Sequence, residues 1–290
     1  MNPSRRGRRS GDPEREGGFT LIELLVVIAI IAVLAGLLLP SLSRAKARAV
    51  GIACMGNLRQ MQIAWELYTT DHGGALVPNA HSPASGREPD RPSWVGGWLG
   101  FDEREDNTEV RWLMDPTFLH GARLAPYLQA HAVYKCPADR SQAPNQGTLK
   151  PRLRTVSMNC HMNGLEVLGI DAFWQSAAFV TFRNSSDFNG GSPAQLFVFV
   201  DEREDSINDG YFAVDLDNQL GSHTIVDFPA SYHNESANFT FADGHAEAHR
   251  WRDPRTRPPL IRGQLLDLNV ASPTNVDVVW FQERVSFRHP

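Results

Sequence analysis

The sequence predicts an α+β fold, in which a long N-terminal membrane-spanning α-helix packs on a C-terminal antiparallel β-sheet head. Three observations support this prediction. Residues 19–39 form an apolar run that is long enough to cross a bilayer as a helix. Apolar residues then recur at helical spacing from residue 54 to residue 68. Beyond residue 75 the chain changes to short apolar runs between Pro-, Gly- and Asp-rich turns, which is typical of strands.

Composition narrows the function classes. The chain has 290 residues, a hydrophobic fraction of 42%, 7 Trp and 15 Phe, which is enough for a sizeable core. Its formal net charge is −5, although the first 18 residues carry five arginines. A nucleic-acid-binding protein would present a basic face, so no nucleic-acid partner is expected. The sequence contains no P-loop, no Gly-rich dinucleotide fingerprint and no Ser/His/Asp order, so we expect no enzyme.

The apolar run contains one carboxylate, Glu23. A charge near the middle of a bilayer costs about 2.5–3.5 kcal/mol, and such residues usually have a partner and a function. Because arginines precede the run, the positive-inside rule places the N-terminus in the cytoplasm and the body outside. The alternative is a secretory signal cleaved near Ala45-Lys46-Ala47, but the run exceeds the usual length of such a signal.

Residues 17–24, "GGFTLIEL", resemble the class III signal of type IV pilins and type II secretion pseudopilins. Pro40 occupies the helix-bending proline position of that family. In the family a membrane peptidase cuts after the glycine and methylates the new N-terminal Phe. The resemblance therefore implies processing at Gly17, Gly18 and Phe19, with cleavage after Gly18. It divides the chain into a leader (1–18), a transmembrane and polymerisation helix (19–72) and an α+β head (75–290).

The same resemblance implies how the subunit assembles, through Phe19, Glu23 and Pro40. The Glu23 carboxylate of one subunit would neutralise the Phe19 α-amine of its neighbour in a medium of low dielectric constant, where charges interact strongly. The implied partners are inner-membrane lipid, the prepilin peptidase/methyltransferase and other pilin or pseudopilin subunits. The expected location is the inner membrane, single-pass, with a periplasmic head that is extracted into a filament.

This resemblance predicts a structural subunit, either a pseudopilin or a minor pilin. Two other function classes stay open. One is a membrane-anchored module that recruits a substrate or glycan without polymerising, with Trp94 and Trp98 as candidates for an aromatic site. The other is a secreted enzyme behind a signal peptide. The sequence leaves open whether the filament is a pilus or a secretion pseudopilus.

After the membrane the helix is predicted to continue. An apolar stripe recurs at steps of three and four residues, which is typical of a helix that packs on a sheet; it comprises Cys54, Leu58, Met61, Trp65 and Tyr68. Gly73 and Gly74 predict the stop, because glycine readily adopts the left-handed conformation that ends helices. Pro40 removes a backbone hydrogen bond and is expected to bend the helix.

The head is predicted from shorter signals. Residues 195–202, "QLFVFVDE", read as a buried strand. Residues 93–101, "SWVGGWLGF", suggest a strand with a glycine bulge or turn. The C-terminal "NVDVVWFQERVSFRHP" (275–290) alternates enough to suggest an edge strand.

Asp243-Gly244 lies between alternating segments and is a strong two-residue hairpin signal. Pairing Ala242 with His245 would set Phe239 and Phe241 opposite Ala248 and Ala246, and leave the other face polar. The segment also resembles the H-x9-DG signature that accompanies prepilin-type N-termini, through His233, Asp243 and Gly244. That resemblance implies no catalytic residues.

Two groups of side chains are weak metal candidates. His245 and His249, with Glu247, share one predicted strand face with Asp243 or His233 nearby, a set that suits a transition metal. Asp205 and Asp209 belong to an acidic loop that suits Ca²⁺, although Ile207 interrupts the EF-hand pattern. Solvated acidic loops and hairpin faces are common without metals. We therefore expect no cofactor, with Ca²⁺ as the alternative.

The three cysteines are Cys54, Cys136 and Cys160. In an oxidising compartment the simplest arrangement is one disulfide and one free thiol. We predict a disulfide between Cys54 and Cys136 that ties the helix to the head. The alternatives are a bond between Cys136 and Cys160, or three buried thiols.

Overall fold

A computed structural model describes residues 20–165, 178–216 and 223–289. The chain divides into two compact units, residues 1–45 and 46–290. Helix α1 (Leu21–Asp71) contributes to both units. Each unit is described below by itself.

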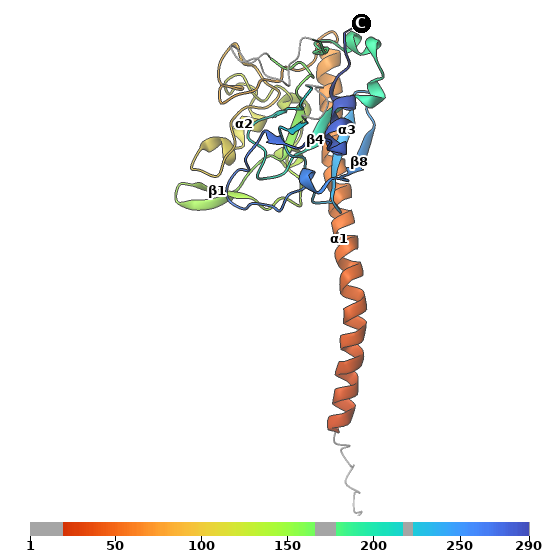
Figure 1. Ribbon diagram of the computed structural model, residues 1–290. Helices are drawn as coiled ribbons and strands as arrows, with labels where there is room; N and C mark the ends of the chain where they lie inside the picture. Colours follow the sequence, from red (N-terminus) through yellow and green to blue (C-terminus); the bar gives the residue numbers. More distant parts are fainter. Residues whose placement is uncertain (1–19, 166–177, 217–222, 290) are drawn as a thin grey trace, which may run out of the picture. The chain divides into compact units, whose positions relative to one another are not determined.

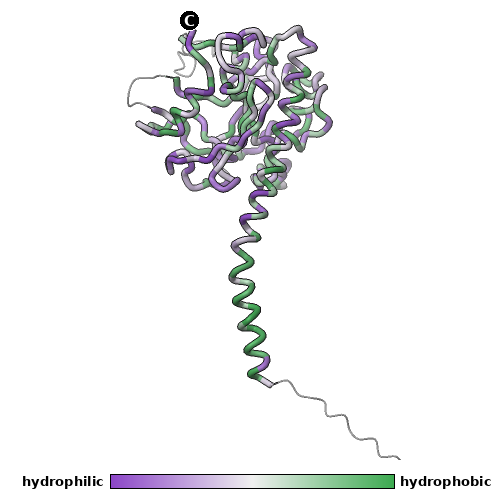
Figure 2. Tube along the Cα trace, turned by 90° about the vertical axis from the view of Figure 1, so that its right-hand side faces the viewer, coloured by the Kyte–Doolittle hydropathy of each residue, from purple (hydrophilic) through white to green (hydrophobic). Residues whose placement is uncertain are grey.

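In the first unit α1 is apolar around its whole circumference. The helix continues through Pro40, and nearly every side chain from residue 21 to 45 is exposed. Figure 2 shows hydrophobic colouring along this part of the helix. By length and composition α1 is able to cross a membrane, and none of its most apolar window is buried. An apolar surface of this extent is stable only when lipid or protein covers it.

In the second unit the remainder of α1 packs on the head through the predicted stripe. Leu58, Met61 and Trp65 are fully or almost fully buried and share one core cluster with the sheet residues Val198 and Phe199. The helix ends at Asp71, just before the two glycines that predicted its end. Gly73 and Gly74 have positive φ, and the Gly74 N–H donates to the Thr69 carbonyl, which is the bond of a Schellman cap.

The head is built around a five-stranded sheet in the order β5-β3-β4-β7-β8. Figure 1 labels β4 and β8 of this sheet. The predicted buried strand is confirmed as β4 (Phe197–Asp201), at the centre of the sheet. The pairs β3–β4, β4–β7 and β7–β8 are antiparallel, whereas β3 and β5 are parallel. The other strands of this sheet are β3 (Val156–Asn159), β5 (Tyr211–Phe212), β7 (Ser236–Phe241) and β8 (Ala246–Arg250).

Smaller elements surround this sheet. Two two-stranded sheets pair β1 with β2 and β6 with β9. Their strands are β1 (Gln142–Asn145), β2 (Thr148–Pro151), β6 (Thr224–Ile225) and β9 (Val270–Ala271). Among the described residues the other helices are α2 (Arg111–Met114), α3 (Val276–Val285) and six 3-10 turns: η1 (Glu105–Asn107), η2 (Ala125–Tyr127), η3 (His131–Tyr134), η4 (Ser185–Gly190), η5 (Pro193–Gln195) and η6 (Pro254–Thr256).

Both faces of the sheet are covered. One cluster contains Leu58, Met61 and Trp65 of α1, and a second cluster contains Phe281 and Val285 of α3 with Phe239 of β7. A change of register between Phe197 and Val200 brings two consecutive residues, Val198 and Phe199, into the α1 cluster. A bulge permits this departure from strict alternation.

The predicted register of the β7–β8 hairpin is wrong by one residue. Phe239 pairs with Glu247, and Thr240 with Ala246. The Phe241 N–H donates to the His245 carbonyl, so the loop has three residues and ends at Gly244, whose φ is +89°. A three-residue loop with glycine in the left-handed conformation is a common alternative to the two-residue turn. Asn238 and Thr240 are buried, so their face of β7 is not the solvated surface that the sequence suggested.

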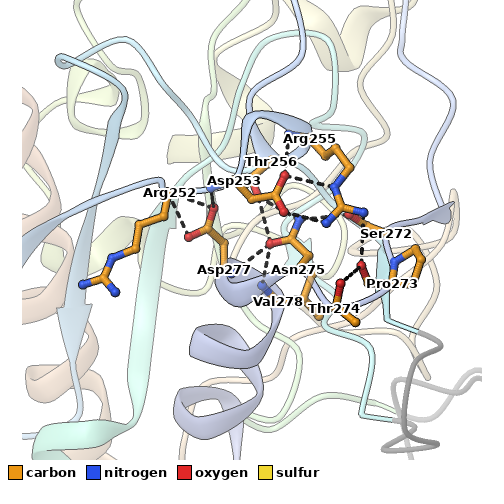
Figure 3. A network of polar contacts seen from close by, with 10 residues as sticks. All are labelled: Arg252, Asp253, Arg255, Thr256, Ser272, Pro273, Thr274, Asn275, Asp277 and Val278. Carbon is orange, nitrogen blue, oxygen red and sulfur yellow. Dashed lines mark hydrogen bonds and ion pairs between the residues drawn. The ribbon is translucent and has the colours of Figure 1, made fainter.

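The C-terminal edge strand is also wrong, because residues 276–285 form helix α3. The Asn275 side chain caps it by accepting from the Asp277 and Val278 N–H groups (Figure 3). Asp277 in turn accepts from the Arg252 and Asp253 backbone N–H groups. The buried apolar residues Val278, Phe281 and Val285 recur at helical spacing. The alternation of apolar and polar residues in the same segment led to the wrong prediction of a strand.

The third correction concerns residues 93–101, which contain no strand. Trp94 is fully buried, and its indole N–H lies within 3.1 Å of both the Asn79 side-chain oxygen and the Gly210 carbonyl. A buried indole needs such partners. The segment is held by side-chain contacts and by irregular backbone hydrogen bonds, such as that from the Trp94 N–H to the Pro78 carbonyl, rather than by a strand ladder.

Candidate functional site

The N-terminal segment is the first candidate site. The predicted processing residues Gly17, Gly18 and Phe19 lie outside the described residues. Thr20 is the first residue that the structure describes, and it caps α1 together with Glu23. The Glu23 carboxylate accepts from the Thr20 N–H at 2.9 Å and from the Thr20 hydroxyl at 2.7 Å, while the Glu23 N–H lies 3.2 Å from that hydroxyl. This reciprocal arrangement is a capping box.

The capping box gives Glu23 a local function that the sequence interpretation missed. The signal was present, because Thr-x-x-Glu before an apolar run is the capping-box pattern. One Glu23 oxygen serves the cap, and a carboxylate has acceptor capacity for further partners. Capping therefore leaves room for the predicted pairing with a neighbouring subunit.

The second candidate site lies in the head, where four buried side chains from distant parts of the chain converge. We call Cys54, Cys136, Asp201 and His233 the Cys-Asp-His cluster. The Cys54 sulfur lies 2.9 Å from Asp201 Oδ1. The His233 Nε2 atom lies 3.2 Å from the Cys136 sulfur and 3.7 Å from Asp201 Oδ2. One ligand atom from each residue falls within 4.8 Å of the others.

Four separate segments position this cluster. Cys54 belongs to α1, Cys136 follows η3, and Asp201 ends β4. His233 lies in the loop that precedes β7. A Cβ atom at Gly51 of α1 would approach the His233 ring to 3.2 Å, so a small residue on the helix makes room for the imidazole.

Burial and mutual charge shift the pKa values in the cluster. The hydrogen bond with Cys54, assisted by His233, lowers the pKa of Cys136 to about 5 although burial opposes the shift. The same contact, burial and the Asp201 charge raise the pKa of Cys54. Burial and the Cys136 charge raise the pKa of Asp201 to about 7. Burial alone would lower the pKa of His233, but Cys136 and Asp201 raise it. The Cys136 thiolate beside His233 is therefore the favoured charged pair.

Further hydrogen bonds hold the four side chains in place. Asn238 of β7 donates to Asp201 Oδ2 from its backbone N–H and from its side chain, at 3.2 and 3.0 Å. Its side chain also lies 3.3 Å from the Gly51 carbonyl of α1. The Cys136 N–H donates to the Thr155 hydroxyl, and the Ala138 N–H donates to the Cys136 sulfur at 3.4 Å.

The predicted disulfide is absent. The structure brings Cys54 and Cys136 into one cluster, but all three cysteines are free and buried. The two sulfur atoms hydrogen-bond each other and contact Asp201 and His233, but no covalent bond joins them. Cys160 belongs to the core cluster on the α3 side of the sheet, where burial raises its pKa to about 12.

The hairpin residues that were metal candidates do not form one group. His245 hydrogen-bonds Asp243 across the turn at 2.5 Å. His249 stacks on Trp280 with 4.0 Å between ring centroids, and burial lowers its pKa to about 4. His233 belongs to the Cys-Asp-His cluster and not to the hairpin group.

The acidic loop after β4 is also arranged differently from the prediction. Asp205 forms a two-pronged ion pair with Arg203. Asp209 accepts from the Ser82 and Tyr211 N–H groups and pairs with His81 at 2.9 Å. Both carboxylates are buried, so they stabilise the loop rather than face solvent. Calcium binding here stays a prediction.

The aromatic candidates Trp94 and Trp98 are separated by burial. Trp94 belongs to the core. Trp98 is half-buried and lines an open recess with Arg87 and Asp106. No aromatic platform is formed by the pair.

A buried carboxylate near this loop predicts a pH effect. Asp227 is buried, and it accepts from the Ala213 N–H at 2.6 Å. Burial and the neighbouring Glu202 and Asp209 charges raise its pKa, although His81 opposes them. A raised folded-state pKa contributes stability at acidic pH that is lost as pH rises through the folded pKa. Asp227→Asn should therefore raise Tm at pH 8 and change it little at pH 4.

Thermal unfolding of the full chain in detergent micelles measures this effect. Asp115→Asn is the control of opposite sign, because hydrogen bonds from Thr117 lower the pKa of this exposed carboxylate. The control should not raise Tm at pH 8. Equal Tm changes for Asp227→Asn at both pH values would contradict the assignment.

Comparisons with known proteins address the N-terminal segment. Residues 15–39 match the family model for the prokaryotic N-terminal methylation motif. The chain is 47% identical over 55 residues to the type IV wide pilus major component PilA4 of Thermus thermophilus. That alignment covers 19% of this chain and 42% of the relative, so less than half of the relative is matched. No solved structure matches the chain.

The two matches agree with the features of the described residues. The motif includes Glu23 and most of the exposed apolar helix. The antiparallel-rich sheet of the head and the long apolar helix fit a pilin-like α+β arrangement. In this N-terminal segment the chain carries the prokaryotic N-terminal methylation motif and is similar to a type IV pilus component.

Proposed function

We propose that this protein is a structural subunit, a pseudopilin or minor pilin, of a type II secretion or type IV pilus-like filament. One observation carries the proposal: a prepilin-type motif coincides with a helix whose apolar side chains are exposed all around. Lipid covers such a helix before assembly, and neighbouring helices cover it afterwards. The subunit is a single-pass protein of the inner membrane, with a cytoplasmic N-terminus and a periplasmic head.

The proposal assigns the covalent steps to the first residues of the chain. A prepilin peptidase cuts between Gly18 and Phe19, and the new α-amine of Phe19 is methylated. The apolar segment stays attached, because it is both the anchor and the polymerisation surface. The role is structural, and no residue of the head is assigned to catalysis.

Gly18→Arg should abolish processing, because a bulky side chain next to the scissile bond obstructs the peptidase. Mass spectrometry of the membrane fraction should find wild-type protein beginning at N-methylated Phe19, and full-length Gly18→Arg protein. Gly36→Ala is the control, since an added Cβ at this position of α1 meets nothing within 4 Å; it should be processed normally. A mature chain beginning at Arg48, or Gly18→Arg protein still cut before Phe19, would overturn the proposal.

A further inference from the structure

The Cys-Asp-His cluster has the chemistry of a metal site rather than of ordinary core. Its ligand atoms are two sulfurs, one imidazole nitrogen and one carboxylate oxygen. All four residues are at least nine-tenths buried: Cys54 and Cys136 are 1% and 0% exposed, Asp201 is 0% exposed and His233 is 7% exposed. Grouping these side chains away from water is costly unless they are paired or coordinate a metal.

The spacing of the four atoms fits a small tetrahedral ion. Zn²⁺ binds sulfur at about 2.3 Å and nitrogen or oxygen at about 2.0–2.2 Å, which places adjacent ligand atoms about 3.3–3.8 Å apart in a tetrahedron. In the cluster the Cys54 sulfur lies 2.9 Å from Asp201 Oδ1, and the His233 Nε2 atom lies 3.2 Å from the Cys136 sulfur and 3.7 Å from Asp201 Oδ2. All four ligand atoms lie within 4.8 Å of one another, so side-chain adjustments of about 1 Å would bring them to tetrahedral spacing.

We propose that Cys54, Cys136, Asp201 and His233 bind one Zn²⁺ ion as a structural site of the head. Two thiolate ligands with an imidazole favour zinc over Ca²⁺ and Mg²⁺, which take oxygen ligands. Four protein ligands in a buried position close the coordination sphere, as in structural rather than catalytic zinc sites. Asn238, Thr155 and the Ala138 N–H supply the outer hydrogen bonds that orient metal ligands.

Such an ion would join α1 to three other parts of the head. Cys54 comes from the helix and Asp201 from the central strand, so the bound ion fixes the helix against the sheet. A bound ion would also give the two ends of the H-x9-DG segment, residues 233–244, separate functions. His233 is a ligand, whereas Gly244 supplies the left-handed residue of the hairpin loop.

Metal analysis of the full chain, purified in detergent under reducing conditions, tests the proposal. Wild-type protein should hold one zinc per chain, and Cys136→Ser and His233→Ala should lose it. Cys160→Ser is the matched control, because Cys160 is an equally buried free cysteine on the α3 side of the sheet; it should keep its zinc. Zinc loss from Cys160→Ser, or full retention by both ligand variants, would overturn the assignment.

A second measurement uses the wild type alone and so does not depend on how the variants fold. Protein stripped with a chelator and refilled with Co²⁺ should show the intense visible bands of tetrahedral cobalt and a thiolate-to-cobalt charge-transfer band. Added zinc should displace the cobalt ion and so remove both sets of bands. It should also raise Tm above that of the metal-free protein, because an ion bound only by the folded state stabilises that state. Absence of these bands from the reduced chain overturns the proposal, and so does peptide mapping of untreated protein that finds Cys54 bonded to Cys136.

Discussion

A Glu23→Ala chain should be processed at the normal rate and yet be missing from filaments. The reason is electrostatic. The proposed cleavage before Phe19 would create an α-amine four residues before Glu23 in the sequence, and each charge is costly in a medium of low dielectric constant unless it is paired. When the carboxylate of one subunit meets the amine of the next, the pair fixes the axial position of the incoming subunit.

The capping box provides the variants that separate this role from local helix stability. Glu23→Gln keeps an acceptor at the third position of the helix, so it keeps a capping box but loses the charge. Thr20→Ala removes the capping hydroxyl and keeps the charge; loss of a cap costs about 1 kcal/mol of helix stability. If the charge sets assembly, Glu23→Gln fails as completely as Glu23→Ala, and Thr20→Ala assembles.

Filament incorporation is measured by co-expressing tagged variant and wild-type subunits and quantifying both in sheared filaments. Mass spectrometry of the membrane fraction confirms that each variant is cut before Phe19. Glu23→Gln protein incorporated at the wild-type level would refute charge pairing and leave capping as the role of Glu23.

The sequence was sufficient wherever one local pattern determined the structure. The stripe from Cys54 to Trp65 is buried on one helix face, because helical spacing alone decides which side chains share a face. The stop at Asp71 followed from two adjacent glycines. The central strand β4 could be read from a run of consecutive apolar residues, since a strand covered on both faces needs no alternation.

The hairpin shows where local patterns become ambiguous. Asp243-Gly244 is compatible with loops of two or three residues, and the two differ by one residue of register. A one-residue slip changes every partner across the strands, so Phe239 faces Glu247 rather than Ala248. The contacts of β7 with α1 and α3 decide between these registers. These contacts join segments that are far apart in the sequence, so the local sequence of the hairpin does not predict them.

The Cys-Asp-His cluster could be predicted only in part. Cys54 and Cys136 were paired correctly in space, but the type of contact was not. Asp201 was read as part of the buried strand 195–202, and His233 as part of the H-x9-DG signature and as a neighbour of the hairpin histidines. The ligands come from four segments with no repeated spacing, so no zinc-binding motif exists in the sequence. The convergence depends on how α1 packs against β4 and β7.

Phe239→Ala should produce the largest loss of stability in the head, about 3–5 kcal/mol in the free energy of unfolding. Phe239 is fully buried at the centre of the face covered by α3. Its ring centroid lies 4.9 Å from that of Trp280, 5.7 Å from Phe197 and 5.8 Å from Phe281. Residues fixed by two strands and a helix cannot collapse into the space of a lost ring, so most of the cavity cost remains.

Urea unfolding of the full chain in detergent micelles, followed by tryptophan fluorescence, measures the loss through the shift in midpoint. Leu149→Ala is the control, because this apolar residue of β2 is 66% exposed and its truncation should change stability by no more than about 0.5 kcal/mol. Phe239→Ala removes no group of the Cys-Asp-His cluster, so bound zinc should be unchanged in the folded variant. Phe239 of β7 contacts both Trp280 and Phe281 of α3. A midpoint shift no larger than that of Leu149→Ala would therefore mean that the packing of α3 on the sheet contributes little to the stability of the head.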